Sequence, residues 1–453
     1  MNLLRIISRI IIGIVFIFSG FVKMIDPLGS AFKFTDYFNA FGLGFLNDLV
    51  LPLGILLSVI ELVLGLVIIL GYQRKVAYWV LMVFMSFFTI LTLFLAIFDP
   101  VADCGCFGDA IILTNWQTFF KNVFLMPFVL LLFSDRNRKY SGNGSIFEWG
   151  IIVILLVAVA LSSAYSHRHL PLIDFRSYRV GTNIAEKMII PDDAPVDQYE
   201  TTLHYRNKTT GKIESFTLQD YPRDTVNWEF IDSESRLVKK GYEPPIQDFA
   251  IQDPYNLDIT DLLLNDPGYS LLMIAYDLEK SNPRALQEAN DWANLQRVAG
   301  DYKFYAVTAS PQPIIDMVNR VNALDYSFYS ADEIMLKTII RANPGYVMIK
   351  NGTIIGKWNW RDFPSVANID PDWPLMIDNV VDSFMDYDFM VDQGVMYETL
   401  NFDVIQIDQS ALKYIFNETE NVHSRFITAG FILLIILVLL ILQLIVLIKS
   451  RKN

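Results

Sequence analysis

Long apolar stretches constrain this chain more than any other feature of its sequence. A helix that crosses a membrane needs roughly 20 predominantly apolar residues, because the hydrocarbon layer is about 30 Å thick. The pattern predicts a multi-span α-helical membrane protein with six spans, at residues 6–24, 50–71, 76–98, 117–134, 147–164 and 426–448. The fourth of these spans is the weakest, since Lys121, Asn122 and Pro127 interrupt it, although proline is tolerated where neighbouring helices satisfy the freed carbonyl.

Four clusters of basic residues next to these stretches all fall on the same side of the predicted membrane. By the positive-inside rule, short loops rich in lysine and arginine stay in the cytoplasm. We therefore expect a bacterial inner-membrane protein with both termini in the cytoplasm and with loops 25–49 and 99–116 and segment 165–425 outside. A cleaved signal peptide is the alternative for the N-terminal run, but no small-residue cleavage pattern follows it. The basic residues are Arg5, Arg9, Arg74, Lys75, Arg136, Arg138, Lys139, Lys449, Arg451 and Lys452.

The cysteine count and the net charge exclude several classes of site and partner. The 453 residues include only 2 cysteines, which excludes a disulfide-stapled scaffold, a cysteine-rich zinc domain and a multi-cluster iron–sulfur protein. The net charge of −13 argues against nucleic acid as a partner, because a nucleic-acid backbone must be neutralised by a basic face. The acidic excess lies in segment 165–425, which holds 23 Lys and Arg against 40 Asp and Glu. This acidic segment reads as a water-soluble region between membrane-embedded ends.

The external segment divides by its patterns. Short alternating runs on either side of the turn-forming residues 207–211 predict a β-hairpin within a β-rich region, 165–255. From Tyr269 onward, apolar strands alternate with helical patterns up to a hairpin across Asn351-Gly352, which predicts an α/β domain. The expected organisation is a membrane bundle at 1–135, a fifth helix within 136–164, the β-rich region at 165–255, the α/β domain at 256–362, a connecting region at 363–425 and a C-terminal helix with a basic tail at 426–453.

The α/β domain resembles the thioredoxin-like fold over residues 256–362. The match is most specific at Asn343-Pro344-Gly345 and the hairpin that follows, and the resemblance implies a cis peptide bond before Pro344. Redox-active members carry Cys-x-x-Cys after the first strand, where this chain has residues 277–283 with no thiol. Without a thiolate there is no nucleophile for disulfide exchange, so we expect this domain to recognise or dock a partner.

The two cysteines, Cys104 and Cys106, lie in the external loop between the third and fourth predicted spans. The intervening Gly105 lets the backbone fold tightly, so a strained and labile disulfide could form, which suits an exchanging pair. Two alternatives stay open. The pair could be inert or a structural disulfide, or it could ligate a metal, although the four histidines show no ligand spacing beyond His167-x-His169 and we expect no metal.

Glu61 is the other outlier, near the middle of the second span. A carboxylate at this depth costs several kcal/mol unless it faces the bundle and finds a partner or a proton. Lys23, at the outer end of the first span, is the first candidate partner and Lys121 the second. A structural tie between helices is as good a reading as a proton or quinone site.

Residues 1–135 resemble a known membrane family. Phe18-Ser-Gly-Phe-Val-Lys23, Glu61 with Gly65 and Gly71 downstream, look like the DoxX family, and Asp103-Cys-Gly-Cys-Phe-Gly108 looks like its MauE branch. The resemblance implies disulfide formation in exported proteins together with a thioredoxin-like partner, and a bundle similar to that of quinone-linked vitamin K epoxide reductases.

Two functions remain from the sequence. The first is an extracytoplasmic thiol–disulfide oxidoreductase that uses Cys104 and Cys106, with a membrane quinone as the one cofactor to consider. The second is a non-catalytic envelope assembly or scaffold protein whose external domain binds a partner protein. Both place the chain in a lipid bilayer, and the sequence alone leaves open whether it is an enzyme.

Overall fold

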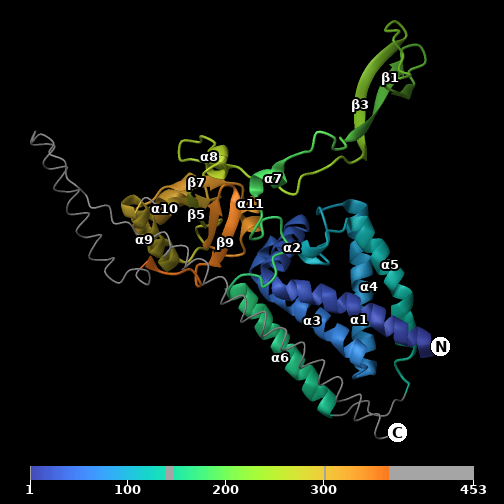
Figure 1. Cartoon of the computed structure of the whole chain (residues 1–453). Helices are drawn as coiled ribbons and strands as arrows, with labels where there is room; N and C mark the ends of the chain where they lie inside the picture. The colour runs from blue at the N-terminus through green and yellow to red at the C-terminus, as the bar shows by residue number, and fades with distance from the viewer. Residues whose placement is uncertain (1, 139–145, 300–301, 367–453) are drawn as a thin grey trace, which may run out of the picture. The chain divides into compact units, whose positions relative to one another are not determined.

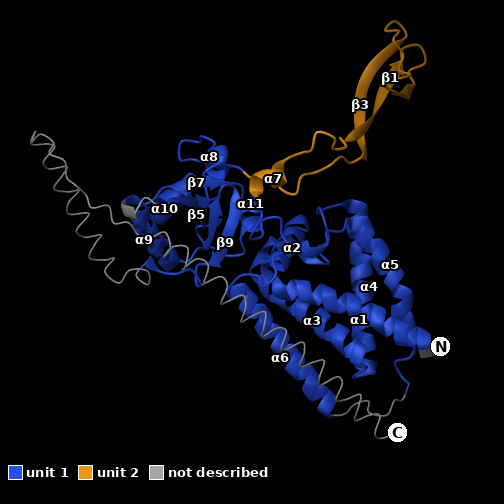
Figure 2. Ribbon diagram, in the orientation of Figure 1, with its two compact units in different colours: residues 1–182, 250–453 blue, residues 183–249 orange. Residues whose placement is uncertain are grey.

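The computed structural model describes residues 2–138, 146–299 and 302–366. The chain forms two compact units, one made of residues 1–182 and 250–453 and the other of residues 183–249 (Figure 2). The sixth predicted span at 426–448, the basic tail and residues 367–425 of the connecting region lie outside the described residues.

Five helices in the described part are long and apolar enough to cross a membrane, and each corresponds to one of the first five predicted spans. Figure 1 shows them in the N-terminal half of the chain, and the first four of them form a bundle together with a shorter helix. They are α1 (Asn2–Ile25), α3 (Val50–Leu70), α4 (Arg74–Phe98), α5 (Asn115–Ser134) and α6 (Ile146–Arg168).

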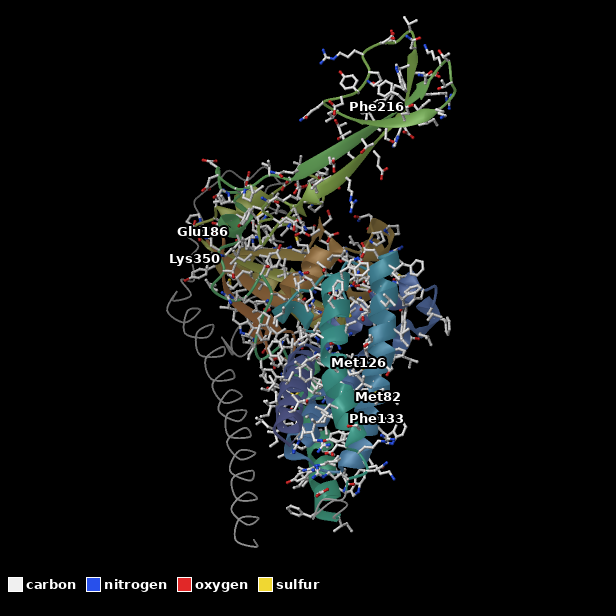
Figure 3. The ribbon with its side chains drawn as sticks, turned by 90° about the vertical axis from the view of Figure 1, so that its right-hand side faces the viewer. Met82, Met126, Phe133, Glu186, Phe216 and Lys350 are labelled. Carbon is white, nitrogen blue, oxygen red and sulfur yellow. The ribbon has the colours of Figure 1, made fainter. Side chains whose placement is uncertain are left out.

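Glycines bring α1 and α3 unusually close. A Cβ added at Gly20 would lie 2.3 Å from the backbone nitrogen of Leu62, and one at Gly65 would lie 2.7 Å from that of Ile17. Small residues at a helix interface let the two backbones approach, which replaces the hydrophobic driving force that lipid does not provide. Leu62 belongs to the core of the bundle, against which Met82, Met126 and Phe133 of the neighbouring helices α4 and α5 pack (Figure 3).

The segment between the first two spans is largely helical, which the sequence reading did not anticipate. Helix α2 (Pro27–Ala40) begins directly after α1, with Asp26 accepting a hydrogen bond from the backbone N–H of Gly29 as the N-cap. The 3₁₀ turns η1 (Gly44–Leu49) and η2 (Gly108–Ala110) complete this end of the bundle. Helix α2 matters because it forms one wall of the site described below.

A mixed six-stranded sheet occupies the α/β region, in the order β4-β7-β6-β5-β8-β9. Strands β5, β6 and β7 are parallel, whereas β8 runs antiparallel to β5 and to β9. The peptide bond between Asn343 and Pro344, just before β8, is cis. The strands are β4 (Ile251–Gln252), β5 (Tyr269–Ile274), β6 (Tyr302–Thr308), β7 (Phe328–Ala331), β8 (Gly345–Lys350) and β9 (Thr353–Asn359).

Both faces of the central strand β5 are buried. Leu271 and Met273 point to the face that packs against helices α9 and α10, where Trp292 is the largest buried side chain. Leu272 and Ile274, one position away in a strand of period two, point to the other face. The helices of this region are α8 (Thr260–Leu264), α9 (Pro283–Ala299), α10 (Gln312–Asn322) and α11 (Glu333–Ile339).

The second unit, residues 183–249, contains α7 (Ile184–Met188) and a three-stranded antiparallel sheet. Its strands β1 (Gln198–Asn207) and β2 (Ile213–Thr217) form the hairpin predicted across residues 207–211, and β3 (Trp228–Lys239) adds a strand on the other side of β1. The ring of Phe216, labelled in Figure 3, lies 6.0 Å from that of Tyr205.

Candidate functional site

The loop between α4 and α5 holds both cysteines. Their thiols are free, and the two sulfurs lie 3.1 Å apart. Cys104 is buried and Cys106 is half-buried. This is the contact distance of two thiols that can form a bond after a small movement, because a disulfide joins its sulfurs at about 2.05 Å.

Gly105 and its neighbours fix the turn of this loop. The backbone of Gly105 has φ +64°, a left-handed conformation that glycine adopts without strain. Its N–H donates to Oδ1 of Asp103 at 2.8 Å, and Nζ of Lys33 on α2 donates to Oδ2 of the same carboxylate at 2.6 Å. A Cβ at Gly105 would lie 2.9 Å from Cγ of Lys33, so α2 leaves no room for a larger residue.

A buried cluster of polar side chains binds the backbone of the second cysteine, Cys106. Lys23 Nζ donates to Glu61 Oε2 at 2.8 Å, to Ser19 Oγ at 2.7 Å and to the backbone carbonyl oxygen of Cys106 at 2.5 Å. Ser19 Oγ also lies within hydrogen-bonding distance of that carbonyl, at 2.6 Å. Helices α1 and α3 thus connect Glu61 directly to the cysteine loop, and the close approach at Gly20 and Gly65 makes the connection geometrically feasible.

Two further side chains complete the shell of the loop. The hydroxyl of Tyr37 on α2 donates to the carbonyl oxygen of Cys104 at 2.7 Å. Lys121 on α5 places its Nζ 4.6 Å from the ring centroid of Phe107, the residue after Cys106. Every helix from α1 to α5 except α4 therefore contributes a polar side chain to this region.

The electrostatic environments of the two thiols differ. The hydrogen bond from Cys104 and the nearby charges of Lys121 and Lys23 lower the pKa of Cys106 to about 6, against the opposing effect of burial. Donating that hydrogen bond, together with burial, raises the pKa of Cys104 far above its usual range. In the reduced pair, Cys106 is therefore the thiol that ionises more readily, and Cys104 is the one that keeps its proton more strongly.

The two sulfurs face an apolar cavity of about 280 Å³ between the helices of the bundle. Aromatic side chains of α2 and α4, including Phe34, Phe38 and Phe88, line most of it. Lys23, Glu61 and Lys121 line its polar side next to the cysteines. A flat apolar molecule that carries polar oxygens at one end matches this lining.

The structure brings most of the predicted site residues together. Cys104, Cys106, Lys23 and Glu61 form one connected site, and Lys121 lies beside Phe107 without a hydrogen bond to Glu61. Pro344 belongs to the six-stranded sheet domain instead. In the described residues, no group of three His, Cys, Asp or Glu side chains is placed to hold a metal ion.

Sequence reasoning missed Ser19, Lys33 and Tyr37. Lys33 and Tyr37 lie four positions apart on α2, so they share a face of that helix. Asp26 followed by Pro27 was the available signal for this helix, as an N-cap residue with proline at the first helical position.

The five apolar helices define the class: this is a multi-pass membrane protein. The family described as methylamine utilisation protein MauE matches residues 1–134, so the N-terminal bundle is a MauE-like membrane region. A domain family of unknown function, DUF8463, matches residues 199–240, which contain the three-stranded sheet. No curated protein and no solved structure matches the chain.

Proposed function

We propose that this protein carries out thiol–disulfide exchange on the extracytoplasmic side of a bacterial inner membrane, through Cys104 and Cys106. The observation that supports it best is the pair of free thiols 3.1 Å apart, one of which has its pKa lowered to about 6. A thiol whose pKa lies below the ambient pH is largely thiolate, and the thiolate is the form that attacks or leaves in exchange.

The exchange begins from an oxidised state in which Cys104 and Cys106 share a disulfide. A client thiolate attacks the Cys104 sulfur, the S–S bond breaks, and Cys106 leaves as a thiolate that Lys121 and Lys23 stabilise. The second client thiol loses its proton and attacks the mixed disulfide, while Cys104 takes up a proton. The client then holds a disulfide, and the pair is in the reduced state.

The reduced pair must pass on two electrons and the single proton held by Cys104, and we propose a membrane quinone as the acceptor. A bound quinone would take up two electrons and two protons to give a quinol, and the second proton would come from water. Phe34, Phe38 and Phe88 would hold its ring in the apolar cavity, and Lys121 would hold a carbonyl oxygen at the polar side. Glu61, hydrogen-bonded to Lys23 beside the pair, is placed to exchange a proton within the site.

We further propose that residues 256–362 form a thioredoxin-like domain without redox activity, which docks a client or another envelope protein. The parallel strands β5 to β7, the antiparallel β8–β9 hairpin and the cis bond before Pro344 support this assignment. The loop after β5 holds no thiol, so exchange falls to the cysteines of the bundle.

Trapping the mixed disulfide tests the exchange. The probe is a peptide whose single thiol is activated with thionitrobenzoate, and the protein is the purified, reduced full chain. Wild type should release thionitrobenzoate and return free peptide thiol, because Cys106 attacks the peptide sulfur and Cys104 then displaces the peptide from Cys106. The Cys104→Ala variant should keep the peptide as a covalent adduct, visible by mass spectrometry. The proposal fails if wild type keeps the peptide as a stable adduct, or if Cys104→Ala returns free peptide thiol as fast as wild type.

The second candidate is an envelope assembly or scaffold protein. It is favoured by the six-stranded domain, which has no thiol of its own. Full rescue of a deletion strain by the double variant would leave partner binding as the working function.

A further inference from the structure

The six-stranded domain contacts the bundle beside the cysteine loop. The ring of Phe32 on α2 lies 6.3 Å from the ring of Tyr276, at the end of β5. The ammonium group of Lys337 on α11 lies 4.9 Å from the centroid of the Phe32 ring, and the guanidinium group of Arg341, just after α11, lies 5.1 Å from it. The domain therefore meets α2 with the end that carries the loop after β5 and the cis bond before Pro344.

Arg341 is the centre of this contact. Its Nε donates to Asp26 at 2.9 Å and its Nη2 donates to Asp109 at 2.8 Å, while its Nη1 donates to the backbone carbonyl oxygen of Lys337. Its side chain is only 7% exposed. Asp26 begins α2 and Asp109 follows Cys106 by three positions, so one guanidinium fastens the domain to both sides of the cysteine loop.

The domain also closes a second cavity over that loop. This cavity, of about 230 Å³, is lined by charged side chains that include Lys33, Asp36 and Lys337. Gly105 lines both this polar cavity and the apolar one, whereas Cys104 and Cys106 line only the apolar cavity. A client that arrives from water therefore meets the domain and then the backbone of Gly105 before it can reach either sulfur.

The contact between the six-stranded domain and the bundle is of a kind that allows the two to separate. The core cluster of the domain and that of the bundle share no residue, and the contact between them combines ion pairs, cation–π contacts and a polar cavity with one aromatic pair, Phe32 and Tyr276. Polar interfaces within a chain resemble transient protein interfaces, so relative motion is expected. A buried arginine with two carboxylates adds geometric specificity more than net stability.

The connecting segment after α6 contacts both the six-stranded domain and the bundle. Lys357 on β9 donates to Asp174 at 2.7 Å and to the carbonyl oxygen of Tyr178 at 3.0 Å, and Asn359 donates to the carbonyl oxygen of His169 at 3.1 Å. Residues 169–178 are thus fastened to the sheet by these hydrogen bonds, while Leu172 among them packs against the core cluster of the bundle.

We propose that the six-stranded domain is a gate over the Cys104–Cys106 loop, held shut by Arg341. In the docked arrangement, the sulfurs are open to the apolar cavity alone and the pair is shielded from external thiols. Release of Arg341 from Asp26 and Asp109 exposes the outer side of the loop to a client. The role given to a client rests on the proposed exchange function, whereas the gate itself concerns only whether a reagent can reach the two thiols.

Alkylation of the reduced full chain in lipid vesicles measures this access. The reagents are a bulky, membrane-impermeant polyethylene glycol maleimide and small, permeant N-ethylmaleimide. In Arg341→Gln, the bulky reagent should react at least about ten times faster than in wild type, while the rate with N-ethylmaleimide should change less than twofold. Arg320→Gln, on the exposed side of α10, is the matched control and should leave both rates unchanged.

A second variant covers the case in which Arg341→Gln fails to fold. Asp26→Asn keeps the side-chain oxygen that caps α2 but removes the charge that Arg341 binds, so it should also speed the bulky reagent. Unchanged or slower reaction with the bulky reagent in a folded variant overturns the gate. The assay needs neither client nor acceptor, so it can fail while the exchange succeeds, and the reverse.

Discussion

Cys106 is the residue whose surroundings depart furthest from those of an ordinary loop cysteine. Its backbone carbonyl accepts hydrogen bonds from the Lys23 cluster, and the charges of Lys121 and Lys23 act on its sulfur. The resulting asymmetry between two thiols that are two positions apart gives one sulfur the role of leaving group and the other that of attachment point.

The pH dependence of alkylation reports this asymmetry directly. In reduced wild type, the rate of reaction of Cys106 with iodoacetamide should rise with a midpoint near pH 6, because the thiolate is the reactive form. Lys121→Gln removes a stabilising cation and should raise the midpoint by about one unit. Lys75→Gln, at the opposite end of α4 from the loop, should not move it. A wild-type midpoint above pH 8 would contradict the assignment.

Only part of the site could be read from the sequence. Glu61 was conspicuous because a carboxylate in an apolar span must find a partner, and the other spans offered only two candidate lysines, Lys23 and Lys121. Tyr37 and Ser19 left no such mark, because they bind backbone carbonyl oxygens, which every residue carries. Arg341 was invisible for another reason: its carboxylate partner Asp26 lies 315 positions away.

At the scale of elements, the pairing of α1 with α3 sets the geometry of the site. Gly20→Ala places a methyl group 2.3 Å from the backbone nitrogen of Leu62, so the two helices must separate. Overpacking of this kind typically costs about 1–3 kcal/mol, and we expect a lower melting temperature for helical circular dichroism in detergent.

Gly150→Ala on α6 is the control for that substitution. A Cβ at Gly150 meets nothing within 4 Å, and alanine favours a helix over glycine by about 1 kcal/mol. The melting temperature of this variant should stay the same or rise slightly. An equal loss in both variants would show that the α1–α3 contact is not the cause.

Which elements could be predicted follows from the forces that form them. The spans were predictable because the thickness of the bilayer demands a long apolar run. The buried strand β5 was predictable because all its inner positions are apolar or small. Helix α2 and the short strand β7 were not, because α2 carries a mixed aromatic and polar face and β7 has only four residues. Their place depends on the contacts that they make with distant segments.

At the scale of the whole molecule, the basic ends of the helices gather at the end of the bundle away from the cysteines. Arg5 pairs with Asp135 at 3.4 Å, which links the start of α1 to the end of α5. Arg9 donates to the carbonyl oxygens of Ile68 and Ile69, near the end of α3, and α4 begins shortly after with Arg74 and Lys75. This arrangement fits a cytoplasmic face, because lysine and arginine are retained on that side during insertion.

Orientation can be tested with one pair of cysteine substitutions in the Cys104→Ala, Cys106→Ala background. Lys208→Cys, in the exposed turn between β1 and β2, should react with an impermeant maleimide in intact cells, because residues 165–425 are expected outside. Lys75→Cys, exposed in the first turn of α4, should react only after the membrane is permeabilised. A reporter fused after Asn453 should behave as cytoplasmic, since the six spans predicted from the sequence would return the chain to its starting side. Labelling of Lys75→Cys in intact cells would reverse the orientation, and the cysteine pair would then face a reducing compartment in which a disulfide does not persist.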